Sequence, residues 1–146
     1  MSILVEIIPN LWYGSIDACT NYGFLSNYHI KKLIIANRRI KIDNHELPIE
    51  TINIRNSYYD SQILLESLDN FTESIHNHIS NNEGVLIICD TGIQCSPTII
   101  AGYLMKYGKM KWEIAKKAIK MKEKTAFEEQ ATFQDIMKIY ETQIKF

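Results

Sequence analysis

The chain has 146 residues, of which 46% are hydrophobic and 23% are charged. This length and composition fit one globular domain with one core, which we assign to residues 1–146. A formal net charge of -1 argues against a nucleic-acid partner and against a membrane recognised by bulk charge. The odd number of cysteines, 3, does not make a disulfide framework and suits a reducing compartment. We therefore expect an intracellular protein, in the cytoplasm or the nucleus.

Two short strands and a helix are predicted at the start of the chain. The sequence around Pro9 and Asn10 predicts two strand pieces joined by a turn at these residues. Ser15 then stands where it can cap a helix that continues toward Leu25. Cys19 falls within this helix, and we interpret it as a small core residue.

The next segment predicts two strands separated by a polar loop. Residues 29–36 predict a loop that leads into a buried strand, whereas residues 51–54 alternate with a period of two and predict a strand nearer an edge. Residues 37–48 have no period of their own and predict the loop. It has three basic side chains, which we expect to be solvated rather than to form a basic rim near a pocket: Arg38, Arg39 and Lys41.

Apolar residues at three- and four-residue spacing predict a helix over residues 63–80. His76 and His78 cannot share a face of this helix, so we expect them to be solvated rather than to bind a metal. Elsewhere, too, the chain shows no cluster with the spacing of metal ligands. We therefore expect no metal and no other cofactor.

Two further helices are predicted after Gly108, which ends the helix before them. The first has a predicted packing stripe of Trp112, Ala115, Ala118, Ile119 and Met121. It also has a dense basic face, which we expect to be solvated, of Lys116, Lys117, Lys120, Lys122 and Lys124. The last helix follows Phe133 and contains Tyr140.

Residues 85–105 predict a strand, a tight loop and a helix placed end to end. The stretch opens with β-branched and apolar residues, in a run short enough for a central strand buried on both faces. Cys89 ends this strand, and the loop runs from Asp90 to Cys95. Ser96 is predicted as the helix N-cap and Pro97 as the first helical residue, where its missing N–H is not needed.

A loop that closes onto a helix N-terminus points several backbone N–H groups into one concavity. The helix dipole adds partial positive charge at the same place, so the loop is suited to binding an anion. The same field favours the charged form of a thiol, and we expect Cys89 to ionise more readily than an ordinary cysteine. A thiolate beneath a bound phosphate is a nucleophile.

This stretch resembles the signature loop of the cysteine-dependent dual-specificity protein phosphatases. The matching residues are Cys89, Gly92, Ser96, Pro97 and Thr98, and the resemblance extends from Ile7 to Glu141. It implies a three-layer α/β sandwich with a mostly parallel central sheet flanked by helices, with the loop at the carboxyl end of the central strand. It also implies that phosphate would bind at Asp90, Thr91, Gly92, Ile93, Gln94, Cys95 and Ser96.

Two positions of the loop depart from the family pattern. Ile88 stands where the family has a histidine, and Cys95 stands where it has the arginine that grips the phosphoryl oxygens. Arginine supplies planar, bidentate and charge-assisted hydrogen bonds there, and cysteine supplies none of them. Losing a single preorganised donor of this kind typically lowers the rate by ~10²–10³.

The family also has an aspartic acid that protonates the leaving oxygen, on the loop after an earlier strand. The candidates for this role are Asn56, Tyr58 and Asp60. Asn56 and Tyr58 have no acidic proton at neutral pH. We interpret Asp60 as an ordinary loop residue or as a cap of the following helix.

The resemblance and its departures leave three functional hypotheses. The first, which we favour, is a pseudophosphatase that keeps the loop and binds a protein or a phosphoprotein, with sulfate or phosphate as a weak ligand. The second is a weakly active phosphatase that uses Cys89 as nucleophile. The third is a redox site, in which Cys89 and Cys95 form a disulfide if their Cβ atoms approach to about 4 Å.

Overall fold

The protein is described from a computed structural model, for residues 3–36, 47–52, 58–89, 95–127 and 133–146. For residues 19, 20, 58 and 59 only the backbone is described. The basic side chains of the predicted loop at 37–48 and the side chain of Cys19 therefore lie outside the described part of the chain.

The middle layer is a five-stranded sheet of β1 (Leu4–Ile8), β2 (Leu11–Gly14), β3 (Ile30–Ile35), β4 (Ile49–Thr51) and β5 (Gly84–Ile88). Its strand order is β1-β2-β5-β3-β4. β1 runs antiparallel to β2 and the other neighbours are parallel, which confirms the predicted mostly parallel sheet. β5 is the central strand, between β2 and β3.

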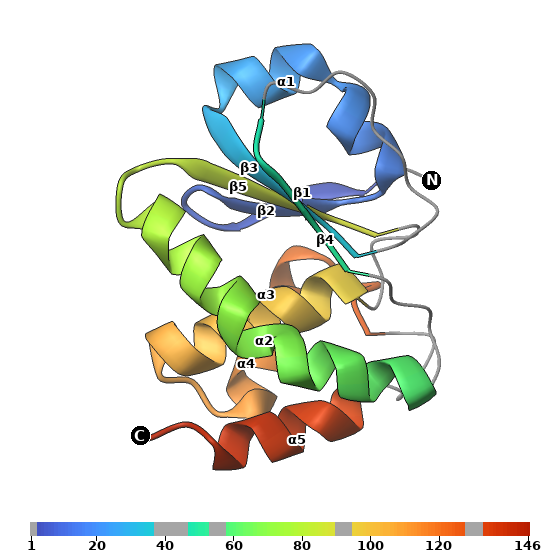
Figure 1. Ribbon diagram of the computed structural model, residues 1–146, viewed down its shortest axis with the longest axis vertical. Coiled ribbons are helices and arrows are strands. Elements are labelled where there is room, and N and C mark those ends of the chain that lie inside the picture. The colour runs from blue at the N-terminus through green and yellow to red at the C-terminus, as the bar shows by residue number, and fades with distance from the viewer. Residues whose placement is uncertain (1–2, 37–46, 53–57, 90–94, 128–132) are drawn as a thin grey trace.

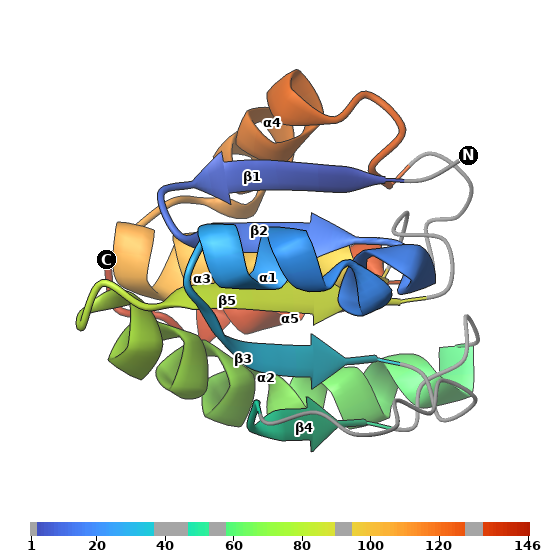
Figure 2. The ribbon, with the colours of Figure 1, turned by 90° about the horizontal axis from the view of Figure 1, so that it is seen from above.

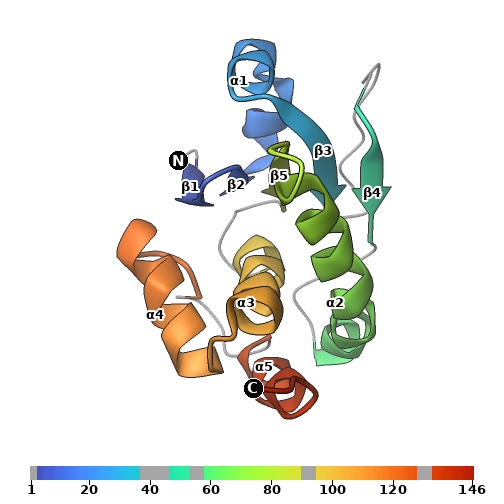
Figure 3. The ribbon, with the colours of Figure 1, turned by 90° about the vertical axis from the view of Figure 1, so that its left-hand side faces the viewer.

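Helices cover both faces of the sheet (Figure 1). They are the 3-10 helix η1 (Ile16–Thr20), α1 (Tyr22–Asn27), α2 (Tyr58–Ile79), α3 (Cys95–Gly108), α4 (Trp112–Lys122) and α5 (Gln134–Thr142). η1 and α1 lie on one face, and α2, α3 and α4 lie on the other (Figures 1 and 2). α5 packs against α2, α3 and α4 on the side away from the sheet (Figure 3). The predicted three-layer α/β sandwich is confirmed.

The core consists of two clusters, one on each side of the sheet. Alternate residues of β5 enter different clusters: Val85 and Ile87 face the layer of α2 to α5, whereas Leu86 and Ile88 face α1. The four side chains are all 0% exposed. This double burial is what the unbroken apolar run of β5 predicts.

The predicted helix after Ser15 is two helices, η1 and α1. The Ser15 hydroxyl does not cap η1, because it accepts a hydrogen bond from Ile3 N (2.9 Å) and donates one to Asp17 Oδ1 (2.7 Å). Asn21 provides a second start, since its side chain accepts a hydrogen bond from Phe24 N (3.1 Å) and caps α1. Local polar side chains thus divide what the apolar pattern presents as one helix.

The boundaries of two other predicted elements differ in the structure. α2 begins at Tyr58 rather than near Ile63, because its first turn is polar and gives no apolar period to read. β4 begins at Ile49 rather than at Thr51 and lies at the sheet edge, as predicted, whereas residues 53 and 54 of the predicted strand lie outside the described residues. None of the helices in the described ranges is long and apolar enough to cross a lipid bilayer.

The histidines of α2 are partly buried rather than solvated, so that prediction was wrong. His76 stacks on Tyr107 with ring centroids 4.1 Å apart, and its Nδ1 lies 3.3 Å from Tyr103 Oη. His78 Nδ1 lies 3.0 Å from Glu83 Oε1. Both rings are held by partners that a helical pattern alone does not reveal. The partners of His76 are tyrosines of α3, and the partner of His78 is a carboxylate in the turn after α2.

The packing stripe of α4 is shorter than predicted. Trp112, Ala115 and Ile119 are buried, but Met121 is 79% exposed and does not join the core. Met121 lies two positions after Ile119, and residues at that spacing point to different sides of a helix. The prediction for Met121 was therefore wrong.

Gly14 is required where β2 passes close to β1 beside the end of β5. A β-carbon at this residue would lie 2.7 Å from the Ile3 carbonyl oxygen and 3.0 Å from Ala18 Cβ. Since the first of these atoms belongs to the backbone, the strands would have to shift. We expect Gly14→Ala to lower the free energy of unfolding by about 1–3 kcal/mol in urea denaturation.

Gly23→Ala in α1 is the matched control, because a β-carbon there meets Asn21 Oδ1 at an ordinary 3.7 Å. This change should raise stability by roughly 0.5–1 kcal/mol through helix propensity. Equal effects of the two substitutions would contradict the steric role of Gly14.

Candidate active-site loop

Cys89 lies at the carboxyl end of the central strand, directly after β5. The last residue of β5 is still hydrogen-bonded to the neighbouring chain segment, because Ala36 N donates a 2.8 Å hydrogen bond to Ile88 O. The Cys89 side chain is 3% exposed and belongs to the core cluster on the α2 to α5 side of the sheet. The sheet thus fixes the thiol at the edge where parallel strands place ligand sites.

α3 begins at Cys95, so the predicted N-cap at Ser96 was wrong. Cys95 is the first residue of the helix, and Ser96 and Pro97 lie within its first turn. Proline is still acceptable there, because the N–H groups of the first turn have no acceptor within the helix. The helix therefore directs the positive end of its dipole toward the segment that follows Cys89. Asp90, Thr91, Gly92, Ile93 and Gln94, predicted to bind phosphate, lie outside the described residues.

Both cysteines of the site are thiols in this structure and are not joined by a disulfide. Cys95 is 4% exposed and belongs to the same core cluster as Cys89. A side chain of this size and polarity fits an apolar cluster, which explains why the first turn of α3 packs against the core.

Two hydroxyl groups in this region are buried without a hydrogen-bond partner among the described residues. They belong to Tyr13 and Ser96, which are each 0% exposed. A buried hydroxyl that lacks a partner typically costs about 1–3 kcal/mol. These two hydroxyls are therefore an energetic cost of the described part of the site.

Tyr13 was not among the predicted site residues. It lies on β2 opposite Ile87 of β5, so its side chain faces the same cluster as Cys89. Burial raises the pKa of Tyr13 far above its ordinary value, and the negative charges of Glu123 and Cys89 raise it further. The phenol is thus in electrostatic range of the thiol and stays protonated. The sequence does contain a signal for Tyr13: side chains alternate along a strand, and counting from Leu11 places this phenol on the buried face of β2.

The candidates for the general acid lie on or before α2. Asn56 is outside the described residues, and for Tyr58 only the backbone is described, as the first residue of α2. Asp60 lies in the first turn of α2 and is 6% exposed, so it is not a loop residue, and its role as a cap of α2 stays a prediction. A carboxylate in the first turn of a helix is stabilised by the dipole.

No group of three or more histidine, cysteine or acidic residues in the described ranges is arranged to hold a metal ion. The described part of the site therefore offers two thiols, a helix N-terminus and two buried hydroxyls. These groups can bind an anion and can supply a sulfur nucleophile.

A mostly parallel sheet with helices on both faces, and a cysteine between its central strand and a helix N-terminus, define the class of cysteine-dependent phosphatase folds. Residues 11–143 match the family "Dual specificity phosphatase, catalytic domain". The chain belongs to this family. The family resemblance of the sequence is thereby confirmed.

Curated relatives agree with this assignment. The chain is 30% identical over 122 residues to "Putative tyrosine phosphatase 123R" of Invertebrate iridescent virus 6, covering 84% of this chain and 81% of that protein. It is 31% identical over 108 residues to human "Dual specificity protein phosphatase 5", covering 70% of this chain. The match spans only 26% of the human protein.

Solved structures share the fold at low sequence identity. A leucine rich repeat and phosphatase domain containing protein from Entamoeba histolytica superposes with a TM-score of 0.83 at 24% identity, covering 96% of this chain and 91% of the other. Human DUSP28 gives a TM-score of 0.87 at 17% identity, covering 96% and 93%. The human tyrosine phosphatase-like serine/threonine/tyrosine-interacting protein gives 0.87 at 19% identity, covering 96% of each chain.

Removing the Tyr13 hydroxyl tests whether it is unpaired. We expect Tyr13→Phe to raise the free energy of unfolding by about 1 kcal/mol, because the ring stays and the unsatisfied polar atom is lost. Tyr140→Phe is the matched control, since Tyr140 Oη donates a 2.8 Å hydrogen bond to Asp69 Oδ1 and its loss should lower stability by roughly 1 kcal/mol. A loss of stability in Tyr13→Phe would show that its hydroxyl has a partner in solution.

The redox hypothesis remains a prediction. Two thiols in one cluster can give a disulfide when hydrogen peroxide accepts two electrons and two protons and is reduced to water. We expect mild peroxide to link Cys89 to Cys95, and a reductant to reverse the link, in mass spectra of peptides spanning residues 84–106. Separate sulfenic or sulfinic adducts on Cys89 would instead make Cys95 a passive replacement for arginine.

Proposed function

We propose that this member of the family is a pseudophosphatase, which binds a protein partner through the phosphatase fold rather than turning over phosphoesters. A single observation carries the proposal: the first residue of α3, where the family has its phosphate-gripping arginine, is the buried thiol of Cys95. Cys89 after β5 and the N-terminus of α3 are retained, whereas Ile88 replaces the family's histidine.

The physical argument concerns charge. A phosphoryl group brings about two negative charges, and its transfer spreads further charge over the oxygens. A guanidinium meets this charge with two parallel hydrogen bonds, whereas a thiol is at best a weak donor. The described hydroxyls of Tyr13 and Ser96 are neutral and do not replace a cation. The rate deficit from losing one such group is typically ~10²–10³.

What remains at the site favours binding over turnover. The N-terminus of α3 still supplies partial positive charge to an anion at the carboxyl end of β5. A phosphorylated side chain of a protein is the ligand that this arrangement suits, held more weakly than with an arginine. Free sulfate or phosphate would occupy the same place. One structural neighbour is itself named as a phosphatase-like interacting protein.

A weakly active phosphatase is the alternative. The observation that favours it is the retained Cys89, fixed at the end of β5 where the family has its nucleophile. The similar viral protein bears the name "Putative tyrosine phosphatase 123R". An intact nucleophile without its cation and without a histidine before it leaves a slow enzyme at most, because residues of one catalytic unit act together.

Turnover of a small aryl phosphate distinguishes these proposals. We expect the wild-type chain to release no more product than Cys89→Ser, since nothing grips the developing charge. Restoring the cation should restore chemistry, so Cys95→Arg should exceed the wild type by about 10²-fold or more. The gain should disappear in the double variant that also carries Cys89→Ser.

Cys95→Ala is the control for disturbing a buried position, and it should stay as inactive as the wild type. Thermal unfolding of each variant separates loss of fold from loss of chemistry. Cys89-dependent turnover by the wild-type chain, above the background of Cys89→Ser, would overturn the pseudophosphatase and support the alternative.

A further inference from the structure

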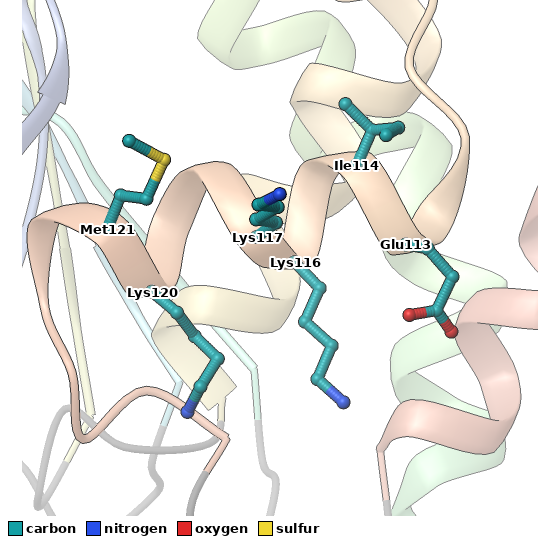
Figure 4. Close-up of a pocket in the computed structure, with 6 residues that line it drawn as sticks. All are labelled: Glu113, Ile114, Lys116, Lys117, Lys120 and Met121. Carbon is teal, nitrogen blue, oxygen red and sulfur yellow. The ribbon is translucent and has the colours of Figure 1, made fainter.

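The outer face of α4 forms a shallow groove with a volume of about 540 Å³. Two parallel rows of side chains line it, each with the three- and four-residue spacing that places residues on one side of a helix. Figure 4 shows the two rows. One row consists of Ile114, Lys117 and Met121, and the other consists of Glu113, Lys116 and Lys120. We call this surface the α4 groove.

The α4 groove exposes apolar side chains that the core does not use. Ile114 is 56% exposed and Met121 is 79% exposed. They are about 10 Å apart along the helix, because each residue adds about 1.5 Å. Met121 is unbranched and flexible, a side chain that adapts readily to a partner surface. The two ends of the groove can therefore each receive an apolar side chain of a ligand.

The lysines of the α4 groove form no ion pair with the acidic side chains of the described residues. Lys116 Nζ donates a 2.6 Å hydrogen bond to Gln134 Oε1, and Lys120 Nζ donates to Lys124 O (3.0 Å) and Ala126 O (2.7 Å). These acceptors are neutral oxygens, so they hold the ammonium groups in place without cancelling their charge. Lys117 is exposed and makes no ion pair within the described residues.

Three ammonium groups on adjacent turns repel one another, and among the described residues that line the groove Glu113 is the only acidic one. An anionic ligand would relieve this repulsion. Because Lys116 and Lys120 are already oriented by their neutral acceptors, less side-chain entropy is lost when they bind.

We propose that the α4 groove is a docking site for an acidic segment of a partner protein. Its carboxylates would pair with Lys116, Lys117 and Lys120, and apolar residues spaced by about two helical turns would contact Ile114 and Met121. The proposal does not depend on whether the Cys89 site is catalytic. It adds a second contact surface, which lies on the outside of the helical layer.

A membrane surface fits the α4 groove less well than an acidic peptide does. Membrane-bound amphipathic helices bury a continuous apolar face that is often rich in aromatic residues. Here Lys117 separates the two exposed apolar side chains, Glu113 would meet anionic lipid unfavourably, and Trp112 is 2% exposed within the core.

A displayed library of random peptides tests the proposal on the full chain. We expect the enriched peptides to carry aspartate or glutamate around apolar residues, and to bind more weakly as salt is added. Affinities are then measured by fluorescence anisotropy with these peptides. Lys117→Glu should lower the affinity about 5-fold or more. Ile114→Ser and Met121→Ser should each lower it about 5-fold.

Lys31→Glu is the matched control, since it makes the same charge change at an exposed residue of β3, away from α4. It should leave the affinity unchanged. Cys95→Arg should also leave peptide binding unchanged, so that failure of the docking proposal and failure of the pseudophosphatase proposal are distinguishable. Circular dichroism confirms that the exposed variants fold.

Three results would overturn the docking proposal. They are a library that yields no acidic peptides, acidic peptides that bind Lys117→Glu as tightly as the wild type, and tight binding to phosphatidylserine vesicles by a chain that binds no acidic peptide. The last result would assign the α4 groove to a membrane surface instead.

Discussion

The structure depends on the burial of β5 on every side. Its two edges are hydrogen-bonded to β2 and β3, and its two faces are covered by different helical layers. A strand confined in this way can move neither sideways nor out of the sheet. Cys89 comes directly after it, so the position of the thiol is set by the core of the whole domain. The site is therefore rigid at its base, whatever chemistry its loop supports.

This confinement also explains which parts of the fold the sequence predicts. The unbroken apolar run of β5 and the apolar helix after it are local signals that tertiary contacts reinforce. Boundaries were less predictable, because they depend on polar contacts. Asn21 starts a second helix in a segment where the apolar spacing predicts a single helix. The first turn of α2 is polar, so the apolar spacing does not reveal where α2 begins. Met121 is exposed despite its hydrophobic side chain, because its position around the helix axis points it away from the core.

For the candidate site, the sequence predicts that Cys89 holds the nucleophile position and that Cys95 replaces the family's arginine. It does not predict which side chains surround these two residues. The type of residue at position 95 can be read directly, whereas its place inside α3 and its burial depend on packing. Tyr13 illustrates the same limit. Its neighbour in space, Cys89, is far away in the chain, and only the register of β2 with β5 brings them to one cluster. Long-range pairing of this kind leaves little local signal in one sequence.

The two outer strands of the sheet limit how copies of this chain can pair through their sheets. β4 has only three residues, with Glu50 at its centre paired to Lys32 at 3.2 Å, and β1 carries the exposed Glu6 at its centre. An added strand would have to pass a carboxylate at either border, and short or charged borders are how sheets avoid growing into aggregates. At high concentration the chain should therefore remain dispersed as far as its sheet is concerned. We therefore expect contacts with other molecules to form through the helices rather than through the sheet edges.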